Sequence, residues 1–283
     1  MILGVLGGSG LYDLDGLSDP RTEEVSTPYG APSAPIVSGS IGPARLLFLP
    51  RHGRGHRFSP SEINYRANVF ALKSLGAERV LSVSAVGSLR QGLAPGDFVL
   101  PDQFIDKTYR RASTFFGDGV VGHVGFAEPT CASFGAAVAA AASRGGKRIH
   151  RGGTYVCMEG PQFSTRAESL LHQSWGADVI GMTAATEAKL CREAEVCFAS
   201  LALVTDYDAW HAEEAAVTVE AVVAVLRANV AGAQDVLRRL GEHVASAAPC
   251  GCARAAAHAV ITAPDAISAE ARGRLRLLHG RDL

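Results

Sequence analysis

Residues 196–208 read VCFASLALVTDYD, and this stretch decides the fold class. Its first ten residues are an almost continuous apolar run, which is typical of a strand covered on both faces of a sheet. Further strands are predicted at residues 2–6, 45–49, 79–84, 98–100, 154–157 and 178–180. Helices are predicted between them at residues 61–75, 130–143, 165–175, 183–194 and 217–244, the first opened by Ser61. This alternation predicts an α/β fold with a largely parallel or mixed central sheet.

The chain shows no internal repeat and no linker before about Ala245. We therefore predict one domain over residues 1–244. Residues 245–283 form a C-terminal extension that is rich in alanine, contains Cys250-Gly251-Cys252 and ends in a short helix at residues 268–278.

The composition is poor in charge, with a net charge of −1 and 19% charged residues in a chain of 283. The hydrophobic fraction of 47% excludes intrinsic disorder, and the near-zero net charge argues against binding to nucleic acid, which needs a basic face. The longest charge-free stretch, residues 25–44, holds four prolines and three glycines and cannot be a membrane helix. Without a secretory leader, the six cysteines are expected to be free thiols in a reducing cytoplasm. The scarcity of charge suggests that copies of the chain cover part of its surface.

Two loops that follow predicted strands are suited to an anion. Gly7-Gly8-Ser9-Gly10 brings backbone amides and a hydroxyl close together, and Arg51-His52-Gly53-Arg54-Gly55-His56 concentrates cationic and donor groups. The first loop is neither a dinucleotide fingerprint nor a P-loop, and the histidines of the second lack the spacing of a zinc site. A tight turn and a solvated turn are the structural alternatives.

Three more strand ends carry candidate binding groups. They are the small-residue turn at residues 82–89, the Gly-Pro corner with Phe163 at residues 158–166, and Gly181-Met182-Thr183 before a helix. The turn could hold a phosphate or a purine edge, and Phe163 could stack on a base. Close packing of the chain is the alternative for the turn and for Phe163.

Asp206 and Asp208 follow the buried strand two residues apart, so both side chains could face the same way. Neighbouring carboxylates repel, which raises one pKa and lets one group donate while the other accepts. Such a pair suits a 6-aminopurine: one carboxylate accepts from the exocyclic amine, and the other protonates ring N7 to assist cleavage of the N-glycosidic bond. A cation site or a helix N-cap is the alternative.

These motifs occur in a recognisable order. The sequence resembles the trimeric purine nucleoside phosphorylase family over about residues 1–240. The matching segments are residues 7–11, 27–30, 51–54, 64–68, 84–89, 159–168, 181–183 and 205–208. The resemblance implies a single α/β domain with a mixed central β-sheet flanked by helices. It also implies inorganic phosphate as co-substrate, no metal or organic cofactor, and a homotrimer or a hexamer.

The resemblance also implies two sets of site residues. The phosphate set is Ser9, Arg51, His52, Ser84, Ala85 and Thr183. The nucleoside set is Phe163, Ser164, Met182, Asp206, Asp208, Val219, Val222 and Val223, with His123 supplied by a neighbouring subunit. Asp206 is the implied catalytic residue at purine N7, and Asp208 would face the 6-amino group.

Within the family, the resemblance is greatest to the branch that acts on 5′-methylthioadenosine. It implies phosphate-dependent cleavage to adenine and 5-methylthioribose 1-phosphate. Another 5′-deoxy-5′-substituted adenosine, or a 6-oxopurine nucleoside such as inosine, guanosine or methylthioinosine, is the alternative substrate, and the two aspartates favour adenine. A hydrolase that uses water and a nucleoside-binding oligomer with a decayed site are two competing hypotheses. For Cys250 and Cys252 we expect free thiols rather than a redox-active disulfide or a metal site.

Overall fold

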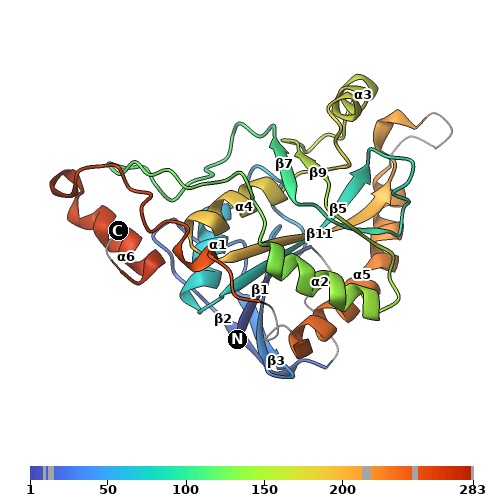
Figure 1. Ribbon diagram of the computed structural model, residues 1–283. Coiled ribbons are helices and arrows are strands. Elements are labelled where there is room, and N and C mark those ends of the chain that lie inside the picture. The colour runs from blue at the N-terminus through green and yellow to red at the C-terminus, as the bar shows by residue number, and fades with distance from the viewer. Residues whose placement is uncertain (9–10, 12–15, 212–217, 244–247, 282–283) are drawn as a thin grey trace.

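The computed structural model describes residues 1–8, 11, 16–211, 218–243 and 248–281. It has helices on both faces of a mixed, 11-stranded sheet, so the predicted α/β fold is confirmed (Figure 1). Within these residues, no helix is long and apolar enough to cross a membrane.

The centre of the sheet is formed by four parallel strands. They are β4 (Ala44–Pro50), β1 (Ile2–Gly7), β5 (Arg79–Ser88) and β11 (Cys197–Asp206). β11 pairs with β5 along nearly its whole length, whereas β1 pairs only with the first half of β5. The last residues of β5 pair instead with the antiparallel β10 (Val179–Gly181). The sheet therefore divides at β5 into two branches.

The remaining strands extend these branches. β2 (Ser18–Glu23) and β3 (Ile36–Ile41) lie beyond β4, and β9 (Thr154–Cys157) and β7 (Gln103–Asp106) lie beyond β10. β6 (Phe98–Leu100) pairs antiparallel with β11 and parallel with β8 (Ile149–Arg151).

Helices cover both faces of the central strands (Figure 1). α2 (Ala132–Arg144) and α5 (Val219–His243) pack on one face. α1 (Tyr65–Ser74) and α4 (Ala184–Glu193) pack on the other. This two-sided burial explains why the central strands are continuous apolar runs.

The sequence prediction missed four strands and was wrong at one helix start. β2, β3, β7 and β8 were not predicted. The edge strand β2 (SDPRTE, residues 18–23) is exposed and polar and carries no apolar pattern, whereas β3 was missed although it lies between β2 and β4 and is mostly buried. Ser61 does not open the first helix. α1 begins at Tyr65, where the Asn64 side chain accepts a hydrogen bond from the Ala67 N–H at 3.2 Å, and Ser61 instead donates to Glu159.

The C-terminal segment packs on the domain at the end where residues 109–126 extend from it (Figure 1). It contains η3 (Cys252–Arg254), η4 (Pro264–Ala266) and α6 (Ala269–His279). Ala256, Ala259 and Leu275 join Phe116 and Val120 in a small apolar cluster of their own. The predicted last helix is present, and it is joined to the domain by buried contacts.

Candidate active site

The candidate site lies where the parallel central strands end. Because β1, β4, β5 and β11 run in the same direction, their carboxyl ends meet at one edge of the sheet. Ligands of α/β proteins bind at this edge. The edge carries the residues after β4, the end of β5 and Asp206, the last residue of β11.

The antiparallel strand β10 brings Thr183 to this edge from the opposite direction. Ile180 pairs with Gly87, so the chain that continues through Gly181 runs back along β5 and carries Thr183 toward Ser84. Thr183 precedes α4 and makes no side-chain cap hydrogen bond there. The hydroxyls of Ser84 and Thr183 are buried and have no hydrogen-bond partner among the described residues. Buried hydroxyls without partners are costly, and an anion at the N-terminus of α4 would satisfy both.

Arg51 lies beneath this edge and is 1% exposed. Its Nε and Nη2 donate to the two carboxylate oxygens of Glu187 at 2.6 and 3.0 Å, and Nη1 donates to the Val83 carbonyl at 2.8 Å. Burial alone would lower the pKa of Arg51, but the Glu187 carboxylate raises it, so the guanidinium remains charged. Five N–H donors are available, and one on Nη1 has no acceptor within the part of the chain that the structure describes. That donor is available to an anion.

His52 is held as a neutral imidazole. Burial and the charge of Arg51 lower its pKa to about 4. Its Nδ1 lies 2.8 Å from the Phe58 carbonyl, which can only accept, so Nδ1 carries the hydrogen. Nε2 is therefore an acceptor at neutral pH, and it suits the P–O–H group of a protonated phosphate.

Asp206 and Asp208 are brought together by a turn. β11 ends at Asp206, and Asp208 lies in the short helix η1 (Asp208–Trp210) with a φ of 50°. The Asp208 N–H donates to Asp206 Oδ1 at 2.8 Å, and the Thr205 hydroxyl donates to Oδ2 at 2.7 Å. Burial raises the pKa of Asp206, and the Asp208 charge acts in the same direction. Asp208 Oδ2 is buried and accepts no hydrogen bond from any described residue. One carboxyl is thus disposed to hold a proton, and the other has an oxygen free to accept.

A buried pair, Arg111 and Glu159, lies beside the segment that carries Met182. Arg111 donates to the carbonyls of Met182 and Glu159, the latter at 2.6 Å. Glu159 accepts from the Tyr109 N–H at 2.8 Å and from Ser61. Burial opposes its ionisation, yet these hydrogen bonds and Arg111 hold the pKa of Glu159 below its ordinary value. The pair orders the segment that carries Met182, which is half-buried.

The other predicted residues occupy different places. Phe163 is 43% exposed, and Ser164 is half-buried with its hydroxyl 3.9 Å from the Met158 sulfur. They precede α3 (Arg166–Ser174), which packs against η1. Ala85 lies on β5, paired with Leu203 of β11.

The three valines lie in the first turns of α5, where Val219 is 62% exposed and Val222 and Val223 are half-buried. His123 is exposed and lies in the segment of residues 109–126 that extends from the domain. Its N–H donates to the Ala259 carbonyl at 2.9 Å, so it does not join this chain's own site. Ser9 lies outside the described residues.

Sequence reasoning missed Glu187, Arg111 and the role of Glu159. Glu187 carried a usable signal, since it falls among the apolar positions of the helix at residues 184–193 and a buried glutamate requires a cationic partner. Arg111 carried none, because it lies in an irregular segment.

The chain was compared with known proteins. The sequence model of the Phosphorylase superfamily matches residues 2–242. S-methyl-5′-thioadenosine phosphorylase of Geobacter sulfurreducens is 53% identical over 280 residues, which cover 99% of this chain and 98% of the relative. The Koribacter versatilis protein of the same name is 50% identical over 279 residues, covering 99% and 96%.

Solved structures agree with these relatives. A methylthioadenosine phosphorylase from an antarctic soil metagenomic library has a TM-score of 0.93 and 46% identity, with 98% of each chain covered. Methylthioadenosine phosphorylase from Schistosoma mansoni, in complex with adenine, has a TM-score of 0.84 and 38% identity, covering 87% of this chain and 92% of the other.

Proposed function

Because the chain belongs to the Phosphorylase superfamily, we propose that it catalyses phosphate-dependent cleavage of 5′-methylthioadenosine to adenine and 5-methylthioribose 1-phosphate. This activity makes it a pentosyltransferase. The observation that carries the proposal is the pair of buried hydroxyls of Ser84, in β5, and Thr183, before α4, which have no hydrogen-bond partner among the described residues; Arg51 and Asp206 lie at the ends of the neighbouring strands β4 and β11. One edge of the sheet thus offers an anion site and a carboxyl acid.

The phosphate site comprises Ser9, Arg51, His52, Ser84, Ala85 and Thr183. The Ser84 and Thr183 hydroxyls and the spare Arg51 N–H donate to phosphate oxygens, and the N-terminus of α4 adds its positive dipole end. His52 Nε2 accepts from the phosphate hydroxyl. These groups hold phosphate with an oxygen directed at C1′ of the sugar.

Asp206 acts at the purine. As the C1′–N9 bond breaks, its electron pair moves into the purine ring, and Asp206 gives its proton to N7. A phosphate oxygen forms the new bond to C1′, and the fixed donors stabilise the charge that develops. Asp208 accepts from the 6-amino group through its free Oδ2, which favours adenine over a 6-oxopurine. Phe163, Ser164 and Met182 line the base and ribose.

The 5′ substituent lies against Val219, Val222 and Val223, with His123 supplied by a neighbouring subunit of a homotrimer, or of a hexamer built from trimers. An apolar pocket of this kind discriminates among 5′ groups by about 1–3 kcal/mol. Other 5′-deoxy-5′-substituted adenosines are therefore secondary substrates. Residues 1–244 form the catalytic domain and residues 245–283 the extension. No disulfide joins the six cysteines, all of which are described, and this fits a reducing cytoplasm.

The test is release of free base from methylthioadenosine, adenosine, inosine and methylthioinosine, each with and without phosphate. We expect adenine release from methylthioadenosine only when phosphate is present, with weaker activity on the 6-oxopurines. Release at an equal rate without phosphate would instead identify a hydrolase.

Asp206→Asn tests the proton donor. We expect kcat to fall by about 10²–10⁴, because the amide cannot deliver a proton. In the wild type, kcat should fall as pH rises through the raised pKa of Asp206, and the variant should lose that limb of the profile. Asp265→Asn, an exposed change in the C-terminal segment, is the matched control. A kcat within threefold of wild type for Asp206→Asn would remove the general-acid role.

A further inference from the structure

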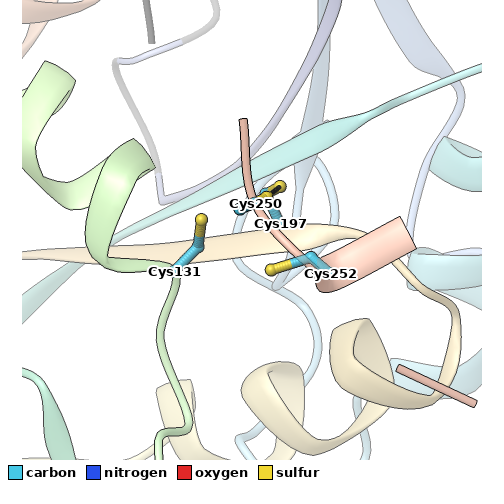
Figure 2. Close-up of side chains that lie close together, drawn as sticks. All are labelled: Cys131, Cys197, Cys250 and Cys252. Carbon is cyan, nitrogen blue, oxygen red and sulfur yellow. Dashed lines mark hydrogen bonds between the residues drawn. The ribbon is translucent and has the colours of Figure 1, made fainter. Parts of the chain in front are cut away.

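Four cysteines from three distant parts of the chain lie together. Cys131, Cys197, Cys250 and Cys252 place all their sulfur atoms within 4.8 Å of one another (Figure 2). Cys131 precedes α2, Cys197 begins β11, and the other two belong to the C-terminal segment. The cluster therefore depends on the tertiary fold and on docking of that segment.

The backbone fixes the positions of these thiols. The Cys131 N–H donates to the Phe198 carbonyl at 2.8 Å, which ties the start of α2 to β11 beside Cys197. In the C-terminal segment, the Arg254 N–H donates to Gly251 O and the Ala255 N–H to Cys252 O, each at 3.1 Å. Cys131, Cys197 and Cys252 are buried and Cys250 is exposed, so the cluster opens to solvent on one side.

The spacing of the sulfurs fits a metal better than disulfides. In a tetrahedral zinc site, Zn–S bonds of about 2.3 Å put the sulfurs about 3.8 Å apart. A disulfide requires about 2.05 Å. The Cys197 and Cys250 sulfurs lie 3.3 Å apart, and all six cysteines are free thiols. We propose that these four cysteines bind one zinc ion as a structural site, in contrast to the free thiols expected from the sequence.

The surroundings favour thiolates at this position. Cys131 lies at the positive N-terminal end of the 13-residue helix α2. Zinc binding would replace four S–H bonds with four Zn–S bonds and release four protons.

Arg79 lies near the cluster and has one buried donor atom with no hydrogen-bond partner among the described residues. Arg79 pairs with Cys197 across β5 and β11, and its guanidinium lies 5.7 Å from the centre of the Phe134 ring in the first turn of α2. The buried donor atom is Arg79 Nη1. A zinc ion with four thiolates carries a net charge of −2, which such a donor would stabilise.

The site is structural because four thiolates fill the coordination sphere. It is also remote from the chemistry: Cys197 and Asp206 are at opposite ends of the ten-residue β11, about 30 Å apart at the rise of a strand. The zinc ion would fasten the C-terminal segment to the domain. The C-terminal segment in turn contacts the segment of residues 109–126. Val260 forms a β-bridge with Gly122, and the Ala259 carbonyl accepts a hydrogen bond from the His123 N–H.

The experiment measures metal in the purified full-length protein. We expect about one zinc per chain by elemental analysis. Cobalt substituted under reducing conditions should show tetrahedral d–d bands and thiolate charge-transfer absorption. Cys250→Ser, which alters the exposed ligand, should lower zinc content at least fivefold, whereas Cys191→Ala, a buried cysteine of α4 outside the cluster, should retain it.

The opposite results are equally clear. Protein that contains no zinc after growth and reconstitution in zinc, and whose cobalt form lacks thiolate charge transfer, would overturn the proposal. So would protein with its thiols blocked at lysis whose intact mass shows two disulfides. If Cys250→Ser fails to fold, the cobalt spectrum of the wild type decides. Phosphorolysis is measured separately, so loss of either proposal leaves the other standing.

Discussion

Removal of the Glu187 carboxylate should cost much of the stability of this protein. Arg51 and Glu187 are each 1% exposed, and their two charge-assisted hydrogen bonds measure 2.6 and 3.0 Å. Ser82 donates to the same carboxylate at 2.6 Å. Glu187→Ala therefore leaves a buried guanidinium without its counter-charge and a buried hydroxyl without its acceptor.

The expected magnitude follows from this geometry. Breaking a buried ion pair by removing one partner costs about 3–5 kcal/mol, because the remaining charge stays desolvated. In a chain of this size each kcal/mol lowers Tm by about 2–4 °C, so Glu187→Ala should melt roughly 6–20 °C below wild type. The KM for phosphate should also rise, since Glu187 sets the position of the guanidinium that offers its spare Nη1 donor.

The assay is urea unfolding at fixed protein concentration, together with thermal melting and a phosphate titration. Glu270→Ala removes a glutamate whose side chain is 86% exposed, and it should change stability by less than about 0.5 kcal/mol. The double variant Arg51→Met/Glu187→Met should lose less stability than the two single changes added together, because it removes both buried charges. A Glu187→Ala protein within 1 kcal/mol of wild type would refute the reasoning.

Two further predictions concern the same edge of the sheet. Gly87→Ala should lower kcat at least tenfold without unfolding the protein, because the new Cβ would lie 3.0 Å from Asp206 Oδ1 and 3.2 Å from Asp208 Cβ. Gly92→Ala is the control, since its new Cβ meets no atom within 4 Å. Equal kcat values for the two variants would contradict this prediction. In phosphate-free buffer, the free energy of unfolding should fall as pH drops from about 6.5 toward 4. In that range the unfolded chain binds a proton at residue 52, because an ordinary histidine has a pKa of about 6.5, whereas in the folded protein the pKa of His52 is lowered to about 4. His52→Gln should reduce this slope in urea unfolding, and an unchanged slope would show that His52 does not contribute to it.

Much of the site was predictable because its residues lie at strand ends. Apolar runs locate the buried strands, so the sequence indicated that Arg51 and Asp206 follow strand ends, whereas the family resemblance was needed to group them with Ser84 in one site. Ser84 lies within β5, so the turn predicted over residues 82–89 is wrong. The edge strands were not predictable, because β2 is exposed and polar. Asp208 was predicted to face the same way as Asp206 through strand alternation, yet it reaches that position through a turn with positive φ.

The sequence by itself determined the α/β class, the apolar central strands and the polar residues that follow them, because those are properties of local composition and spacing. Only the tertiary structure decided which side chains meet. Glu187 is 136 residues from Arg51, and the four cysteines come from three segments that no spacing rule joins. Contacts between distant segments depend on how the helices pack on the sheet and how the C-terminal segment docks. Packing is a collective property of the whole core, so no local pattern records it.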